Sequence, residues 1–213
     1  MREVRLAKSA GFCYGVRRAV ELAQRTAEES GGCWMLGDLI HNSFVVEDLA
    51  RRGVRKTADP AVIPAGETVL IRSHGELKSV LDELEARGVR CINATCPNVI
   101  RIQRLVAQAE AEGRRPVIIG EAAHLEVAGI ASWCGDPLIF DGPDAVRQWL
   151  DAPETNREMP LTVVAQTTCI RELFEISWKI IKKSVQTSKS LIQYVMLRIS
   201  VRPRRRKLPR RRT

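Results

Sequence analysis

The chain has 213 residues, of which 45% are hydrophobic and 28% charged, so it is long enough to bury a sizeable core. No apolar run reaches the roughly 18 residues of a membrane span, and the N-terminus lacks the apolar segment of a signal peptide. These features exclude a membrane protein and favour the cytoplasm. The net charge of +9 comes from residues 184–213, which hold ten Lys or Arg and no Asp or Glu.

Short apolar segments alternate with amphipathic ones along the chain. Strands are expected near residues 4–7, 33–36, 68–71, 89–92, 117–119, 138–140 and 161–164. Helices are expected near 15–29, 43–52, 76–87, 97–112, 125–133, 144–150 and 170–183. This alternation predicts an α/β fold of mostly parallel sheets with helices on both faces. Two similar units, 1–96 and 97–183, are favoured over one sheet, with a basic tail at 184–213.

Two of the six cysteines stand where a helix is expected to begin. Cys13 and Cys96 each follow an apolar strand, and Pro97 suits the first position of a helix. Because unpaired amides and the helix dipole favour a thiolate there, each can be a metal ligand or a nucleophile. Cys33 and Cys91 lie in apolar strands and are expected in the core. The roles of Cys134 and Cys169 are less clear: Cys169 follows Thr168 and could approach the site, but a packing role is favoured for it. With no disulfide framework, the six indicate a reducing compartment.

All three histidines follow predicted strands. His41, His74 and His124 lie in polar segments at strand ends, where open α/β sheets bind ligands. We therefore expect one shared polar site, to which the segment Gln166-Thr167-Thr168 also contributes. Imidazoles and threonine hydroxyls suit an anion such as a phosphate or a diphosphate. Glu126, close behind His124, can donate a proton if burial or a nearby anion raises its pKa.

The spacing of Cys13 and Cys96 bears on the kind of metal site. Without a CxxC pair they argue against a zinc finger and fit better with one ligand from each unit at a shared centre. Iron–sulfur clusters are held by thiolates, but two cysteines are one short of a three-ligand cluster and two short of a four-ligand one. The residue pattern alone leaves the ligand set open.

Taken together, these motifs resemble the LytB-type 4-hydroxy-3-methylbut-2-enyl diphosphate reductases of the non-mevalonate isoprenoid pathway. The resemblance covers residues 1–183 and rests on Ala10–Ala19, Leu39-Ile40-His41-Asn42, Ile71-Arg72-Ser73-His74-Gly75, Ala94-Thr95-Cys96-Pro97, His124-Leu125-Glu126-Val127 and Gln166-Thr167-Thr168. It implies three α/β units around a pseudo-threefold axis, each supplying one cysteine to a 4Fe–4S cluster.

The resemblance also implies roles for individual residues. Cys13 and Cys96 match the first two cluster ligands. The residues expected to contact the substrate and its diphosphate are His41, His74, His124, Thr167 and Thr168. Glu126 matches the proton source, oriented by Thr167. The implied reaction is a two-electron reductive dehydroxylation to isopentenyl and dimethylallyl diphosphate, with reduced ferredoxin or flavodoxin as the electron donor.

The chain departs from the family pattern after residue 183. No cysteine follows Cys169, so the third cluster ligand is missing, and a basic tail replaces the third unit. Residues 184–197 can be encoded by codons that, with one base restored upstream, read Glu-Cys-Thr-Asn-Phe-Lys-Ile-Phe-Asp-Thr-Ile-Cys-Asn-Ala, which contains the expected cysteine motif. We therefore interpret the tail as out of frame and disordered, and expect little reductase activity from this chain.

Two other functions are compatible with the sequence. One is an inactive remnant that keeps two α/β units. The other is a polyanion-binding protein that uses the arginine-rich tail, since clustered arginines neutralise phosphates. No aromatic residue follows Tyr194 to stack on bases, so nucleic acid is not the expected partner.

Overall fold

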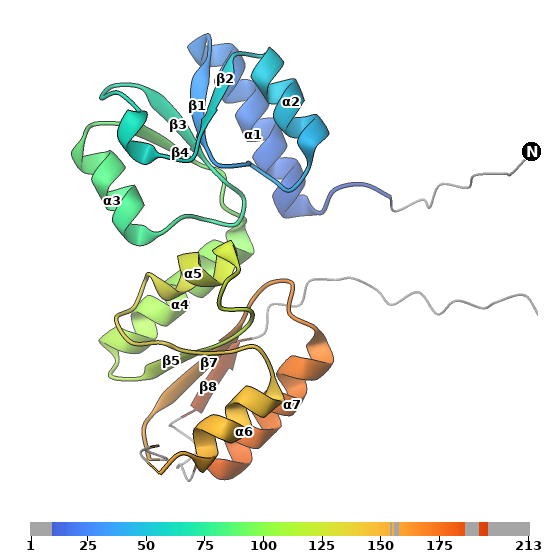
Figure 1. Cartoon of the computed structure of the whole chain (residues 1–213), viewed down its shortest axis with the longest axis vertical. Coiled ribbons are helices and arrows are strands. Elements are labelled where there is room, and N and C mark those ends of the chain that lie inside the picture. Colours follow the sequence, from blue (N-terminus) through green and yellow to red (C-terminus); the bar gives the residue numbers. More distant parts are fainter. Residues whose placement is uncertain (1–9, 154, 156–157, 186–191, 196–213) are drawn as a thin grey trace, which may run out of the picture.

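The computed structural model describes residues 10–153, 155, 158–185 and 192–195 (Figure 1). Strands and helices alternate within these residues, and the strands form two four-stranded sheets in which every paired neighbour is parallel. The predicted α/β fold with parallel sheets is therefore confirmed. None of the helices in the described part combines the length and the apolar character that crossing a membrane requires.

The first sheet has the strand order β2-β1-β3-β4. Its elements are α1 (Tyr14–Ser30), β1 (Cys33–Leu36), α2 (Ser43–Arg51), β2 (Val54–Thr57), the 3-10 turn η1 (Pro60–Val62), β3 (Thr68–Ile71), α3 (Lys78–Ala86) and β4 (Arg90–Asn93). Helices α1 and α2 pack on one face, where Ala23 and Leu49 meet Met35. Helix α3 covers the other face with Leu84. Both faces are thus buried, as in most parallel sheets.

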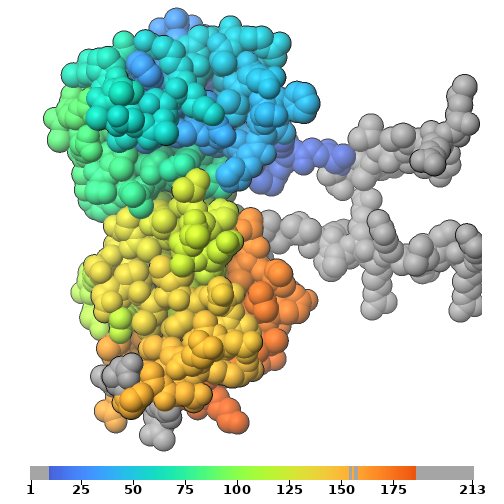
Figure 2. Space-filling model, viewed as in Figure 1, coloured from blue at the N-terminus to red at the C-terminus, as the bar shows by residue number. Residues whose placement is uncertain are grey.

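The second sheet repeats this arrangement with the order β6-β5-β7-β8. Its elements are α4 (Pro97–Ala111), β5 (Arg115–Ile119), α5 (Leu125–Ala131), β6 (Leu138–Phe140), α6 (Pro143–Asp151), β7 (Leu161–Ala165), α7 (Arg171–Ser184) and β8 (Ile192–Val195). Helices α4 and α5 cover one face, and α6 and α7 the other. Figure 2 shows the two halves as adjoining lobes. The division into domains at Cys96 remains a prediction.

Two strands appear that the sequence analysis did not predict. Strand β2 lies at an edge and buries only Val54, while Arg55 and Lys56 are exposed, so it has no apolar run to recognise. Strand β8 pairs with β7 and lies inside the segment 184–213, which had been assigned to the basic tail. The strand expected at 4–7 and the tail residues 186–191 and 196–213 lie outside the described residues.

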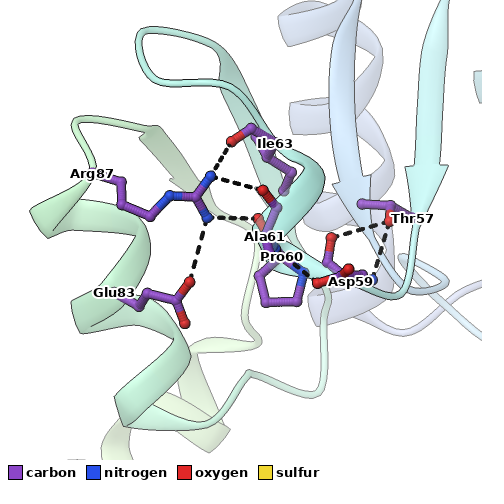
Figure 3. Close-up of polar contacts among 7 residues, drawn as sticks. All are labelled: Thr57, Asp59, Pro60, Ala61, Ile63, Glu83 and Arg87. Atoms are coloured by element: carbon purple, nitrogen blue, oxygen red, sulfur yellow. Dashed lines mark hydrogen bonds and ion pairs between the residues drawn. The ribbon is translucent and has the colours of Figure 1, made fainter.

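The loop between β2 and β3 is fastened to α3 by a single arginine (Figure 3). The guanidinium of Arg87 donates hydrogen bonds to the carbonyls of Pro60, Ala61 and Ile63 at 2.9, 2.9 and 2.6 Å. It also pairs with Glu83 one turn earlier in the helix. These bonds hold the connection against α3, on the face of the first sheet that α3 covers.

Candidate active site

Three imidazole rings meet between the two sheets. His41 follows β1 and His74 follows β3 of the first sheet, whereas His124 follows β5 of the second. The ring centroids of His41 and His74 are 4.4 Å apart, and that of His124 lies 6.5 Å and 6.0 Å from them. His41 is exposed, so solvent and ligands can reach the group. The structure thus brings together the three histidines that the sequence analysis assigned to one site.

His74 is the ring whose chemistry is most changed by its surroundings. Burial, and then the neighbouring His41, His124 and Arg72, lower the pKa of His74 to about 4. The ring is therefore neutral at pH 7, with one nitrogen that donates and one that accepts. Its Nδ1 is buried and has no hydrogen-bond partner among the described residues. Such an atom can be satisfied by a bound polar ligand.

Glu126 is a buried residue in the first turn of α5, with 2% of its surface exposed. Its Oε1 accepts a hydrogen bond from the Thr167 amide at 2.6 Å, and its Oε2 accepts one from the Thr167 hydroxyl at 2.7 Å. The amide of Glu126 donates to Nδ1 of His124 at 3.1 Å. When His124 is neutral, this bond puts its proton on Nε2. The carboxyl and the imidazole are thus oriented by one network.

The loop after β7 is held by Gln166. Its Nε2 donates to the hydroxyl of Thr168 at 3.0 Å, and its Oε1 accepts from the amide of Glu121 at 3.2 Å. Thr168 is exposed, whereas Gln166 is buried. Gln166 therefore links the loop that carries Thr167 to the one that leads to His124.

Cys13 and Cys96 occupy equivalent positions at the N-caps of α1 and α4. Each carbonyl accepts the first hydrogen bond of its helix, and neither side chain caps its own helix. Cys96 Sγ packs closely on Gly15. A Cβ built on that glycine would lie only 2.6 Å from the sulfur, which is too close for a side chain to fit. Arg18 of α1 donates to the carbonyl of Thr95 at 3.2 Å. The two helix starts therefore meet, as a shared thiolate site would require.

The other four thiols lie in surroundings that keep them protonated. Burial raises the pKa of Cys33, Cys91 and Cys169, and raises that of Cys134 to about 11. Cys33 belongs to the core between the first sheet and α1. A high pKa disfavours the thiolate that metals and electrophiles require.

The described residues do not form a complete metal site by themselves. No group of three or more His, Cys, Asp or Glu among them is arranged to hold a metal ion. Cys13 and Cys96 match the ligand type of an iron–sulfur cluster but supply only two thiolates.

The family model described as "LytB protein" matches residues 4–196. The chain belongs to the LytB family. A curated relative from Anaeromyxobacter sp. (strain Fw109-5), named 4-hydroxy-3-methylbut-2-enyl diphosphate reductase, is 37% identical over 174 residues, which are 81% of this chain and 59% of that protein. A relative of the same name from Clostridium perfringens (strain 13 / Type A) is 36% identical over 91% of this chain and 66% of its own length. The LytB chain described here thus spans about three fifths to two thirds of these relatives.

Two solved structures resemble this LytB chain. One is of (E)-4-hydroxy-3-methyl-but-2-enyl diphosphate reductase, with a TM-score of 0.75, 32% identity, and coverage of 92% of this chain and 67% of that one. The other is of the E-1-hydroxy-2-methyl-but-2-enyl-4-diphosphate reductase from Plasmodium falciparum, with a TM-score of 0.79 and 22% identity over 88% of this chain and 57% of that one. The second likeness is evidence for the fold alone.

Sequence reasoning missed several residues of this LytB chain that surround the site. Gly15, Arg18 and Arg72 lie inside the recognised motifs, but no contact was assigned to them. Glu76 lies just outside a motif and pairs with Arg72 at 2.6 Å. The only signal for this ion pair in the sequence was the four-residue spacing of Arg72 and Glu76. That spacing predicts an ion pair within a helix, but these two residues lie in a loop.

Proposed function

We propose that this chain is the part of a 4-hydroxy-3-methylbut-2-enyl diphosphate reductase that binds the diphosphate and supplies the proton. The observation that carries the proposal is the convergence of the three imidazoles beside the Glu126–Thr167 pair. The names of the relatives give the substrate class. The chemistry is a reductive removal of the substrate hydroxyl, which leaves isopentenyl or dimethylallyl diphosphate.

The histidines bind the diphosphate in this proposal. A diphosphate accepts several hydrogen bonds, and His74 and His124 each have an N–H to donate. His124 stands at the N-cap of α5 with Nδ1 already engaged, so its Nε2–H is the donor. Because the rings come from both sheets, a bound anion would also bridge the two halves of the molecule.

Glu126 holds the proton that the product needs. Its two oxygens are held in place by hydrogen bonds from the amide and the hydroxyl of Thr167. A proton on Oε1 or Oε2 would then be presented to the carbon skeleton beside His124. Thr167 acts by holding this carboxyl, and its hydroxyl can also contact the substrate hydroxyl.

Cys13 and Cys96 are proposed as two thiolate ligands of a 4Fe–4S cluster whose third cysteine ligand is missing from this chain. Such a cluster, reduced by ferredoxin or flavodoxin, supplies the two electrons that removal of a hydroxyl requires. The contact of Cys96 with Gly15 supports a shared site for the two sulfurs.

The test compares two proteins: the chain as written and the chain produced after one base is restored near codon 183. Both are reconstituted anaerobically with ferrous iron and sulfide, and visible absorbance, iron content and turnover with a reduced donor are measured. We expect the chain as written to hold no stable cluster and to turn over little, and the restored chain to be active. In the restored chain, Glu126→Gln should lower turnover by about 100-fold or more.

Three outcomes would count against these proposals. A restored chain that takes up iron but does not turn over the substrate overturns the reductase assignment. Full activity of the chain as written overturns the need for a further ligand. A gene sequence in which no single-base change yields a cysteine-bearing third unit overturns the frame-shift hypothesis.

A further inference from the structure

A buried ion pair spans the loop that carries His74. The guanidinium Nη2 of Arg72 lies 2.6 Å from Oε2 of Glu76, and the two side chains are 16% and 7% exposed. By contrast, the Lys78–Asp82 pair one turn later is equally short but 45% and 57% exposed. Exposed pairs contribute little to stability, whereas loss of one partner of a buried pair leaves a costly unpaired charge.

Two further polar atoms of this pair bind the loop itself. Nε of Arg72 donates to the carbonyl of Gly75 at 3.2 Å, and Oε1 of Glu76 accepts from the amide of Leu77 at 3.0 Å. The Gly75 amide donates to the carbonyl of Arg72 at 3.1 Å, and Gly75 has a φ of 86°. The side-chain pair and the backbone turn therefore close around His74 and leave its backbone little freedom to move.

The same loop contacts the other parts of the candidate site. The Ser73 amide donates to the carbonyl of Leu39, close to His41, and the Ser73 carbonyl accepts from the Cys96 amide, both at 2.9 Å. A displacement of this loop would therefore move the His41–His74 ring pair and the start of α4 together.

The loop also reaches the second sheet's helices. A Cβ placed on Gly129 of α5 would lie 3.5 Å from the carbonyl of Glu76, so the two backbones are in close contact. The Lys78 amide donates to the hydroxyl of Ser132 at 2.9 Å. Because α5 begins after His124, the loop also fixes the distance between His74 and the third ring.

We infer that Arg72 and Glu76 are positioning residues: their ion pair holds the His74 loop in the one geometry in which the three imidazoles can bind a diphosphate together. This inference rests on the proposed function for its ligand. Neither side chain needs to touch the ligand, because the pair acts through the loop that carries His74.

The test uses the full chain and inorganic diphosphate as the probe. The chain has only three histidines, so the NMR signals of its imidazole rings report on this site alone. The variant Glu76→Gln keeps the shape of the side chain and removes its charge. We expect it to shift the His74 ring signals and to weaken diphosphate binding by about tenfold or more, as loss of an orienting partner does elsewhere. Asp82→Asn, in the exposed pair, is the matched control and should change neither.

A second variant covers the case in which Glu76→Gln fails to fold. Arg72→Gln combined with Glu76→Gln removes both charges and leaves no unpaired one in the interior. It should fold, yet it should still shift the ring signals and weaken binding. If this double variant binds diphosphate as tightly as the unaltered chain with unchanged ring signals, the inference is wrong. If the unaltered chain binds no diphosphate, the proposed function is wrong. The positioning role is still tested in that case, because the variants either shift the His74 ring signals or leave them unchanged.

Discussion

The sulfur of Cys96 packs directly on Gly15, the second residue of α1, and a Cβ at that glycine would lie only 2.6 Å from Sγ. This contact joins the start of α1, where Cys13 is the N-cap residue, to the start of α4. A side chain at position 15 must therefore displace the sulfur or separate the two helices.

Gly15→Ala should lower the free energy of unfolding by about 1–3 kcal/mol, the usual cost of overpacking. Urea unfolding measures this change. Gly142→Ala is the matched control, because nothing lies within 4 Å of a Cβ there and its φ of 175° is ordinary extended backbone.

A double-mutant cycle identifies the cause of the loss. Adding Cys96→Ala to Gly15→Ala removes the sulfur that the new methyl group meets, so part of the lost stability should return. Strict additivity of the two changes would show that the sulfur is not the obstacle.

The pKa of His74 should be lower in the folded protein than in the unfolded chain. Burial, followed by the charges of His41, His124 and Arg72, lowers the pKa of His74 to about 4, against about 6.5 in the unfolded chain. The folded protein then binds fewer protons than the unfolded chain between those values. The stability that this ring contributes is therefore complete above about pH 6.5 and is lost as the pH falls to about 4.

Imidazole NMR signals followed from pH 7 to pH 3.5 provide the measurement. In His74→Gln this part of the pH dependence of unfolding should be absent. A His74 midpoint near the unperturbed value would contradict the burial that the structure assigns to this ring.

The Thr167 hydroxyl should contribute to stability through Glu126. Thr167→Val removes the bond to Oε2 and leaves a buried carboxyl oxygen without that partner, at a cost of about 1–3 kcal/mol. Thr167→Ser keeps the hydroxyl and should retain most of the stability. Equal free energies of unfolding for the two variants would mean that the hydroxyl bond is not formed in solution.

Arg87→Ala should destabilise the protein. Arg87 lies at the C-terminal end of α3 and takes no part in the histidine site, so this prediction tests the fold alone. It removes the donors to three loop carbonyls (Figure 3), and we expect a loss of about 1–3 kcal/mol in urea unfolding. Arg147→Ala, which breaks an exposed pair with Asp144, should cost less than about 1 kcal/mol. A similar loss in both variants would refute a specific role for the Arg87 contacts.

Much of the fold could be predicted from short-range patterns. The apolar runs of β3 and β7 and the apolar faces of α1 and α4 recur at the periods of strands and helices, and the structure has these elements within a few residues of the expected bounds. Strand β2 was not predicted because it lies at the edge of its sheet. Arg55 and Lys56 are exposed there, so the strand has no run of apolar residues that would mark it in the sequence. Strand β8 was not predicted because residues 184–213 were assigned to a tail on the basis of their positive charge.

The sequence by itself indicated which residues are candidates for the site and that they follow strand ends, because both depend on neighbours along the chain. Only the tertiary structure decided which of them meet. His124 reaches His41 and His74 from a different sheet, Cys96 settles on Gly15, and Arg72 finds Glu76 across a turn. The histidine and Cys96 contacts depend on how the two sheets and their helices pack together, and the Arg72–Glu76 pair depends on the turn between them; no local periodicity encodes either.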